Sequence, residues 1–185
     1  MAQIYIGFVD TPGLFAAMIR KVIRQKYIHV VIAMDAGLDE AYSVGRRHPA
    51  VPLIAGFERE DKQKILKVFP QADYMVCSVE CTEVQKQWIK EELHQKMEER
   101  YHYHYAVAGL PFILLNKPFY QKNHYTCSSF IGRLLEEAGI CQWEKHFSLV
   151  TPKDFMIRFG SNRIFEGRLE ELVEENEALE GLYAV

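Results

Sequence analysis

The segment from His124 to Ile140 most constrains the fold of this chain, because it places a cysteine at the beginning of a strongly indicated helix. Serines fill the first turn after Cys127, and Gly139 suits the left-handed conformation that ends many helices. The thiol of Cys127 would then lie at the positive end of the helix dipole, which lowers a thiol pKa and favours the nucleophilic thiolate. A buried structural cysteine is the alternative, since cysteine is among the most buried residue types. Apolar residues follow helical spacing at Phe130, Ile131, Leu134, Leu135 and Ala138.

A run of apolar and β-branched residues from Tyr27 to Met34 predicts a strand covered on both faces, and His29 interrupts it. An unpartnered polar group costs about 1–3 kcal/mol when it is buried, so the imidazole needs a partner. A backbone carbonyl would provide one, as for many core histidines. A cysteine nucleophile would provide another, because it requires a base of this kind. Together, His29 and Cys127 suggest a thiol–imidazole pair.

The order and the motifs of these two segments resemble the circularly permuted branch of the NlpC-type papain-like superfamily. His29 begins a strand after a short helix at 14–20, and the motif aromatic-x-Cys-Ser-x-Phe follows much later, from Tyr125 to Phe130. Ordinary papain-like enzymes carry the cysteine helix before the histidine strand, and the permuted branch reverses that order. The resemblance spans about residues 4–155. It implies a permuted papain-like α+β fold and a cysteine amidase, peptidase or acyltransferase that needs no cofactor and no metal.

A third residue should bind the distal nitrogen of His29, hold its tautomer and stabilise the imidazolium. The resemblance points to Glu40, where this family often has a polar residue. The turn at 35–37 leaves alternatives open. A three-residue turn would pair His29 with Ser43, whereas a two-residue turn would place Glu40 and Tyr42 on the face of His29. The expected catalytic residues are Cys127, His29 and Glu40, with Ser43 and Tyr42 as alternatives to Glu40.

Length and composition predict one globular domain over residues 1–185 with an acidic C-terminal segment at 166–185. A net charge of −3 gives no broad attraction to nucleic acid. No secretory signal or membrane-spanning run is evident, so we expect a cytoplasmic protein. The expected ligands are a small peptide, a cell-wall fragment or an acylated small molecule. A non-catalytic ligand-binding domain that keeps the papain-like cleft is the alternative function.

The remaining pattern predicts helices packed on an antiparallel sheet, which is an α+β arrangement. Residues 45–56 contain proline and glycine and are expected to form a loop, and the glutamate-rich C-terminus is expected to be a helix with a solvated face. The predicted strands are 4–9, 27–34, 38–44 and 73–79, and the predicted helices are 11–25, 82–97 and the one that begins near Cys127.

Two further groups could bind a metal or carry out redox chemistry, which gives a third possible function. Cys77 and Cys81 are spaced C-x3-C, but no second pair follows at zinc-site spacing. His102 and His104 alternate with tyrosines in the segment from Tyr101 to Tyr105 and lack an evident third ligand. The sequence favours a core position for Cys77 and places Cys81 at the end of the same strand. The resemblance implies that the aromatic segment forms a wall of the cleft, with Tyr103 or Tyr105 as the substrate contact.

Overall fold

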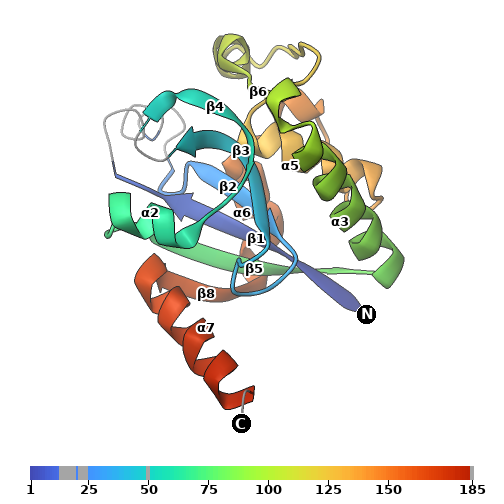
Figure 1. The fold of residues 1–185 in the computed structure, drawn as a ribbon. Coiled ribbons are helices and arrows are strands. Elements are labelled where there is room, and N and C mark those ends of the chain that lie inside the picture. Colours follow the sequence, from blue (N-terminus) through green and yellow to red (C-terminus); the bar gives the residue numbers. More distant parts are fainter. Residues whose placement is uncertain (13–19, 21–24, 49–50, 184–185) are drawn as a thin grey trace.

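The computed structural model describes residues 1–12, 20, 25–48 and 51–183. Within this part of the chain it contains eight strands in one sheet and six α-helices, so the protein is α+β, as the sequence predicts (Figure 1). The helix predicted over 11–25, including its core at 14–20, lies almost entirely outside the described residues.

The sheet has the order β7-β6-β4-β3-β2-β1-β5-β8. Each neighbouring pair is antiparallel except β6 and β7, which are parallel, so the sheet is mixed rather than purely antiparallel. The predicted strands at 4–9 and 73–79 are both present and are slightly longer than expected. The strands are β1 (Ala2–Asp10), β2 (His29–Ala33), β3 (Ala41–His48), β4 (Val51–Arg59), β5 (Asp73–Cys81), β6 (His104–Tyr105), β7 (His124–Tyr125) and β8 (Arg163–Arg168).

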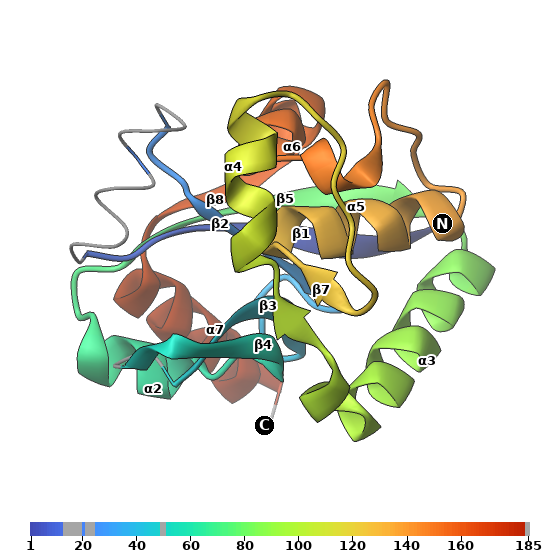
Figure 2. The same cartoon turned by 90° about the horizontal axis from the view of Figure 1, so that it is seen from above.

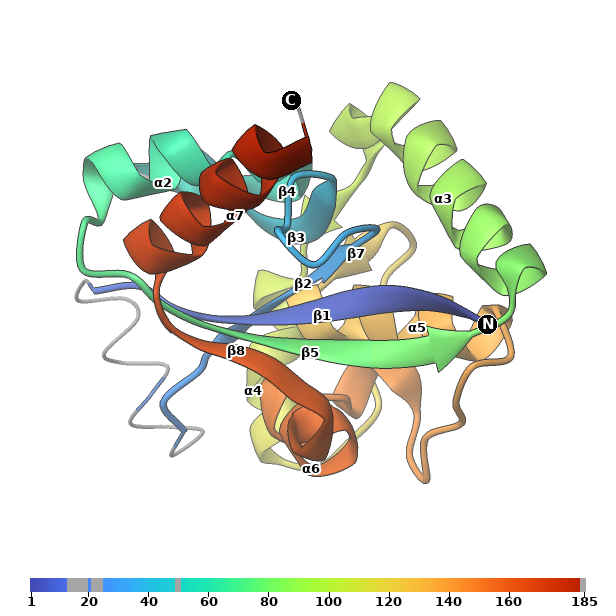
Figure 3. The ribbon, with the colours of Figure 1, turned by 90° about the horizontal axis from the view of Figure 1, so that it is seen from below.

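The helices cover the sheet in two groups, each with its own apolar core. One core joins the sheet to α3, α5 and α6, and the other joins it to α2 and α7. Figure 2 shows α5 and α6 together, and Figure 3 shows α2 and α7 on the opposite side of β1 and β5 from α6. The helices are α2 (Lys62–Val68), α3 (Glu83–Glu98), α4 (Leu110–Leu114), α5 (Cys127–Glu137), α6 (Pro152–Phe159) and α7 (Leu169–Tyr183).

Helix α5 begins at Cys127, as predicted, because its first turn is capped in both directions. The hydroxyl of Thr126 accepts a hydrogen bond from the backbone N–H of Ser129 at 3.1 Å, and the Ser129 hydroxyl accepts one from the Thr126 N–H at 2.9 Å. Gly139 has a φ of 67°, which is the left-handed conformation expected after the end of the helix. Phe130 anchors α5 to the sheet by packing on Phe57 of β4, with ring centroids 4.9 Å apart. The cysteine is therefore held at a fixed, buried helix end.

The connection between β2 and β3 is longer than either turn considered from the sequence. The Asp35 carboxylate accepts the backbone N–H groups of Asp39 and Glu40, and Leu38 adopts a φ of 58°. As a result, Ile32 pairs with Tyr42 and Ala33 with Ala41. This register continues toward a pairing of the His29 position with residue 45, so Ser43 lies on the face of His29 and Glu40 and Tyr42 lie on the opposite face.

The loop predicted over 45–56 is wrong, because residues 45–48 complete β3 and residues 51–56 form most of β4. The two strands pair from Tyr42–Arg59 to His48–Val51, with an irregularity between Arg46 and His48.

The expected C-terminal helix with a solvated face is confirmed for the side chains that the structure describes. In α7, Leu169 and Leu172 are buried while most of the described glutamates are exposed. No helix in the described part of the chain is long and apolar enough to cross a bilayer.

Candidate active site

The structure brings Cys127 and His29 together. Cys127 is the first residue of α5, His29 is the first residue of β2, and their side chains form a hydrogen bond. The thiol is buried, while about one quarter of the histidine side chain is exposed, so the pair lies just below the surface. The two residues are far apart in the sequence, and the packing of α5 against β2 and β3 brings them into contact.

A carboxylate that the sequence analysis missed completes this arrangement. Glu60 directly follows β4, and its Oε1 lies 3.2 Å from Nε2 of His29, which leaves Nδ1 to face the thiol. Ser43 donates a short hydrogen bond to the same Glu60 oxygen. The backbone N–H of Glu60 donates to the carbonyl of Ala41 at 2.9 Å, which fixes the carboxylate beside β3. Four side chains, those of Cys127, His29, Glu60 and Ser43, therefore form one continuous hydrogen-bonded chain.

The structure corrects the prediction for Glu40, which does not contact His29. Its carboxylate binds Lys90 at 3.0 Å and His94 at 2.7 Å, both on α3. Tyr42, the other alternative on that face, donates a hydrogen bond to Glu40 at 3.4 Å. The reason is the register of β2 and β3, which directs residues 40 and 42 away from the face of His29. Ser43 does lie near His29, but it acts on Glu60.

Gly45 provides the space in which the imidazole lies. A Cβ atom at this position would stand 2.9 Å from Cε1 and 3.3 Å from Nε2 of His29. The first distance is shorter than Cβ atoms tolerate, so any larger residue would push the ring off its place. Gly45 therefore contributes to the site by its lack of a side chain.

The electrostatics of the pair favour a thiolate and an imidazolium. Burial opposes charge on His29, but the Cys127 thiolate and then the Glu60 carboxylate outweigh it and raise the pKa of His29 to about 10. Burial likewise opposes charge on Cys127, yet His29 and the backbone N–H groups of Val30 and Ser128 lower the pKa of the Cys127 thiol below its ordinary value. Burial also opposes charge on Glu60, and its hydrogen bond with His29 holds the pKa of that carboxyl low.

The other three cysteines have the opposite character. Burial raises the pKa of Cys77 and of Cys141 to about 11, and it also raises the pKa of Cys81. Cys77 lies in the core within β5, as predicted, and Cys81 is the last residue of that strand. Cys127 is the one cysteine of the four whose surroundings favour the thiolate, and a thiolate beside an imidazolium can act as a nucleophile next to a proton donor.

Two tyrosines before α4, Tyr103 and Tyr105, lie in different surroundings. Burial raises the pKa of Tyr105 and the negative charge of Cys127 raises it further, so its hydroxyl stays protonated near the thiol. Tyr103 instead packs among Phe57, Tyr125 and Phe130.

A stable metal site usually needs at least three protein ligands. Among the described residues, no group of three or more metal-binding side chains lies together.

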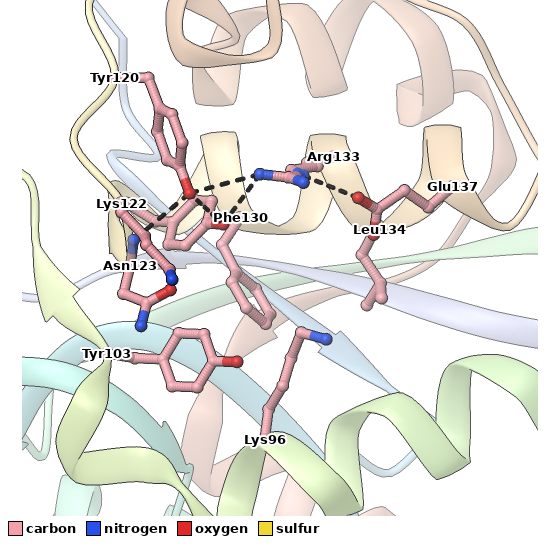
Figure 4. A pocket seen from close by; sticks show the side chains of 10 residues that line it. Lys96, Tyr103, Tyr120, Lys122, Asn123, Phe130, Arg133, Leu134 and Glu137 are labelled. Carbon is pink, nitrogen blue, oxygen red and sulfur yellow. Dashed lines mark hydrogen bonds and ion pairs between the residues drawn. The ribbon is translucent and has the colours of Figure 1, made fainter.

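A cavity of about 290 Å³ lies between α3 and α5 and continues along α5 from Phe130 (Figure 4). Arg133 projects into it, held by Glu137 at 2.7 Å and by the Tyr125 hydroxyl at 3.1 Å. Tyr103 and Lys96 lie across the opening from Arg133 in Figure 4. This cavity begins one helical turn after Cys127 and has aromatic walls with polar tips, so it can accept a small ligand with both apolar and polar parts.

Comparison with models of known protein families, with curated proteins and with solved structures finds no match.

We expect Cys127 to react before the other cysteines with iodoacetamide at neutral pH. Cys81 and Cys141 are 8% and 5% exposed, against 4% for Cys127, so accessibility alone would not favour Cys127. Each unit of pKa changes the thiolate fraction by about tenfold, so the lowered pKa should decide the order. Mass spectrometry of partly labelled protein measures it. His29→Ala should slow the labelling of Cys127, because the imidazolium that stabilises the thiolate is gone. Equal rates at Cys127 and Cys141 in the wild type would contradict an activated thiol.

Glu60→Gln and Glu40→Gln form a matched pair that tests the third residue. Glu60→Gln should slow the labelling of Cys127 on the order of tenfold, because loss of the carboxylate destabilises the imidazolium. Glu40→Gln should change the rate by less than about twofold, since its partly exposed ion pairs contribute little and lie on the other face. The pseudo-first-order labelling rate at neutral pH is the measurement. An equal loss in both variants would show that Glu60 has no special relation to His29.

Proposed function

We propose that this protein is a thiol hydrolase of the amidase or peptidase type, or an acyltransferase, that acts on an amide or acyl-ester bond. The observation that carries the proposal is the chain Cys127–His29–Glu60, in which the cysteine pKa is lowered and the histidine pKa is raised. The other cysteines, which are also buried but have no histidine among the charged groups that act on them, have raised pKa values. Burial alone therefore does not account for the state of Cys127.

In the proposed reaction the Cys127 thiolate attacks the carbonyl carbon of the substrate and forms a C–S bond. The carbonyl oxygen takes up the negative charge, and His29 then gives its proton to the departing amine or alcohol as the bond to that group breaks. The product of this half-reaction is a thioester on Cys127. Water, or a second nucleophile in an acyltransferase, gives a proton back to His29 and attacks the thioester, which restores the thiolate and the imidazolium.

Glu60 and Ser43 would act through the histidine. The Glu60 carboxylate holds Nε2, so that Nδ1 faces the sulfur in both halves of the reaction. Ser43 fixes the orientation of that carboxylate. We assign stabilisation of the developing oxyanion to backbone N–H groups at the beginning of α5 and to the hydroxyl of Tyr105, which stays protonated beside Cys127.

For the fold we propose the permuted papain-like arrangement, in which the histidine strand precedes the cysteine helix. The order of His29 and Cys127 and the packing of the N-terminus of α5 against β2 support it. We propose small peptides, cell-wall fragments or acylated small molecules as substrates, and the cytoplasm as the place where they are met. The cavity beside Phe130 and Arg133 offers space for the substrate group nearest to the reacting carbonyl.

Trapping of the thioester tests the proposed function directly. Wild-type protein incubated with p-nitrophenyl acetate should gain one acetyl group on Cys127, seen by intact-mass and peptide mass spectrometry, and should release p-nitrophenol. Cys127→Ser should lower the rate of release by about a hundredfold or more, and His29→Ala should do the same, because each removes a group that reacts. Cys141→Ser is the control and should match the wild type.

Acylation that is spread over several cysteines, or release that is unchanged in Cys127→Ser, would contradict the proposed function. In that case the non-catalytic ligand-binding domain becomes the better interpretation.

A further inference from the structure

The chain between β6 and β7 forms a short helical excursion whose exposed side is entirely apolar. It consists of a 3-10 turn at Val107–Gly109 and the helix α4, drawn in olive above β6 in Figure 1 and labelled in Figure 2. The exposed residues recur at intervals of three and four, so they share one side of the helix. We call this side the α4 face, and it consists of Val107, Ala108, Pro111, Leu114 and Leu115.

The side of the excursion opposite to the α4 face is packed against the rest of the protein. Gly109 is buried, and Phe112 stacks on Phe119 with ring centroids 4.5 Å apart and an interplanar angle of 13°. The helix is therefore tied down on its inner side. Leu114 and Leu115 nevertheless remain 64% and 65% exposed, which is unusual for two adjacent leucines at the end of a packed helix.

The lysines and arginines are the only formally charged residues on the stretch of chain that carries the α4 face. The sequence contains no aspartate or glutamate from Arg100 to Leu135, although the whole chain has a net charge of −3. Lys117 is exposed and follows α4 after three residues, and the exposed Lys122, which follows after eight, lines the cavity of Figure 4. Neither forms an ion pair with any residue that the structure describes. An apolar surface on a stretch of chain that carries lysines and no carboxylates is suited to an apolar surface that carries negative charge.

We propose that the α4 face docks on an anionic lipid surface. The apolar side chains would enter the boundary between headgroups and acyl chains, and Lys117 would contact the phosphate or carboxylate headgroups. The excursion projects from the fold and has five residues in α4, so it lies on a membrane and does not span one. This docking is independent of the chemistry proposed for Cys127.

Co-sedimentation with lipid vesicles tests the proposal on the full chain. Wild-type protein should bind vesicles of phosphatidylcholine with roughly one third phosphatidylserine, and should bind pure phosphatidylcholine much less. Binding to the anionic vesicles should fall when the salt concentration is raised from about 0.1 M to about 1 M, since the headgroup attraction is then screened. Cys127→Ser should bind like the wild type, so failure of the proposed chemistry would leave this result unchanged.

Two double variants with equal added charge separate the α4 face from general effects. Leu114→Asp/Leu115→Asp should weaken binding to the anionic vesicles on the order of tenfold or more. The control is Val84→Asp/Ile157→Asp, at positions 79% and 74% exposed on α3 and α6, and it should bind like the wild type. Circular dichroism of both variants shows whether they are folded.

Three results would overturn the proposal. Wild-type protein that does not bind the anionic vesicles would exclude a lipid surface. Equal losses in the two double variants would show that the α4 face has no special part. A dimer in size-exclusion chromatography that Leu114→Asp/Leu115→Asp abolishes, without vesicle binding by the wild type, would identify a second copy of this chain as the occupant.

Discussion

The contact between the Cys127 thiol and the His29 imidazole is the interaction on which the candidate site depends. The thiol is buried and the imidazole is largely buried, and burial acts against the charged form of both. The charged forms are favoured only because the two groups meet and because other groups add to the effect. The N–H of Val30 supports the thiolate, and Glu60 supports the imidazolium. Without the contact, burial would favour the neutral form of both groups, and the Cys127 thiol would no longer be activated as a thiolate.

The packing around this contact makes its geometry specific. The capping box of Thr126 and Ser129 fixes where α5 begins, and the Phe57–Phe130 contact fixes α5 against the sheet. On the side of His29 away from the thiol, the β3–β4 pairing brings Glu60 to the beginning of β2, although 31 positions separate Glu60 from His29. Since the helix and the strands are each held by their own core contacts, the thiol, the imidazole and the carboxylate are aligned before any ligand binds.

The sequence predicts those parts of the site that depend on local signals. The start of α5 at Cys127 follows from Thr126, the two serines and the apolar spacing, and each of these lies within a few residues of the next. The third residue depends on long-range pairing, which local patterns do not determine. A left-handed Leu38 lengthens the β2–β3 connection, and this moves Glu40 to the other face. Glu60 lies in a charged run, Glu58 to Asp61, that looks like ordinary solvated surface.

Two glycines explain why the end of β3 and most of β4 resemble a loop in the sequence. Gly45 and Gly56 act as strand breakers in a sequence-based interpretation, but here each makes room for a close neighbour. A Cβ on Gly45 would stand 2.9 Å from Cε1 of His29, and a Cβ on Gly56 would stand 2.4 Å from the carbonyl oxygen of Tyr103. The apolar run at 51–57 is the available signal for β4, and Pro52 and Gly56 outweigh it.

The titration of His29 by nuclear magnetic resonance tests the central claim most directly. The chain has seven histidines, and His29→Gln identifies the signal of His29 in protein labelled at histidine. In the wild type the His29 ring should lose its proton with a pKa of about 10, so it should be an imidazolium at neutral pH. In Cys127→Ser the pKa should fall, because the thiolate that stabilises the positive charge is absent and burial then favours the neutral ring. A His29 that titrates near its ordinary value of 6.5 in both proteins would contradict the thiolate–imidazolium pair.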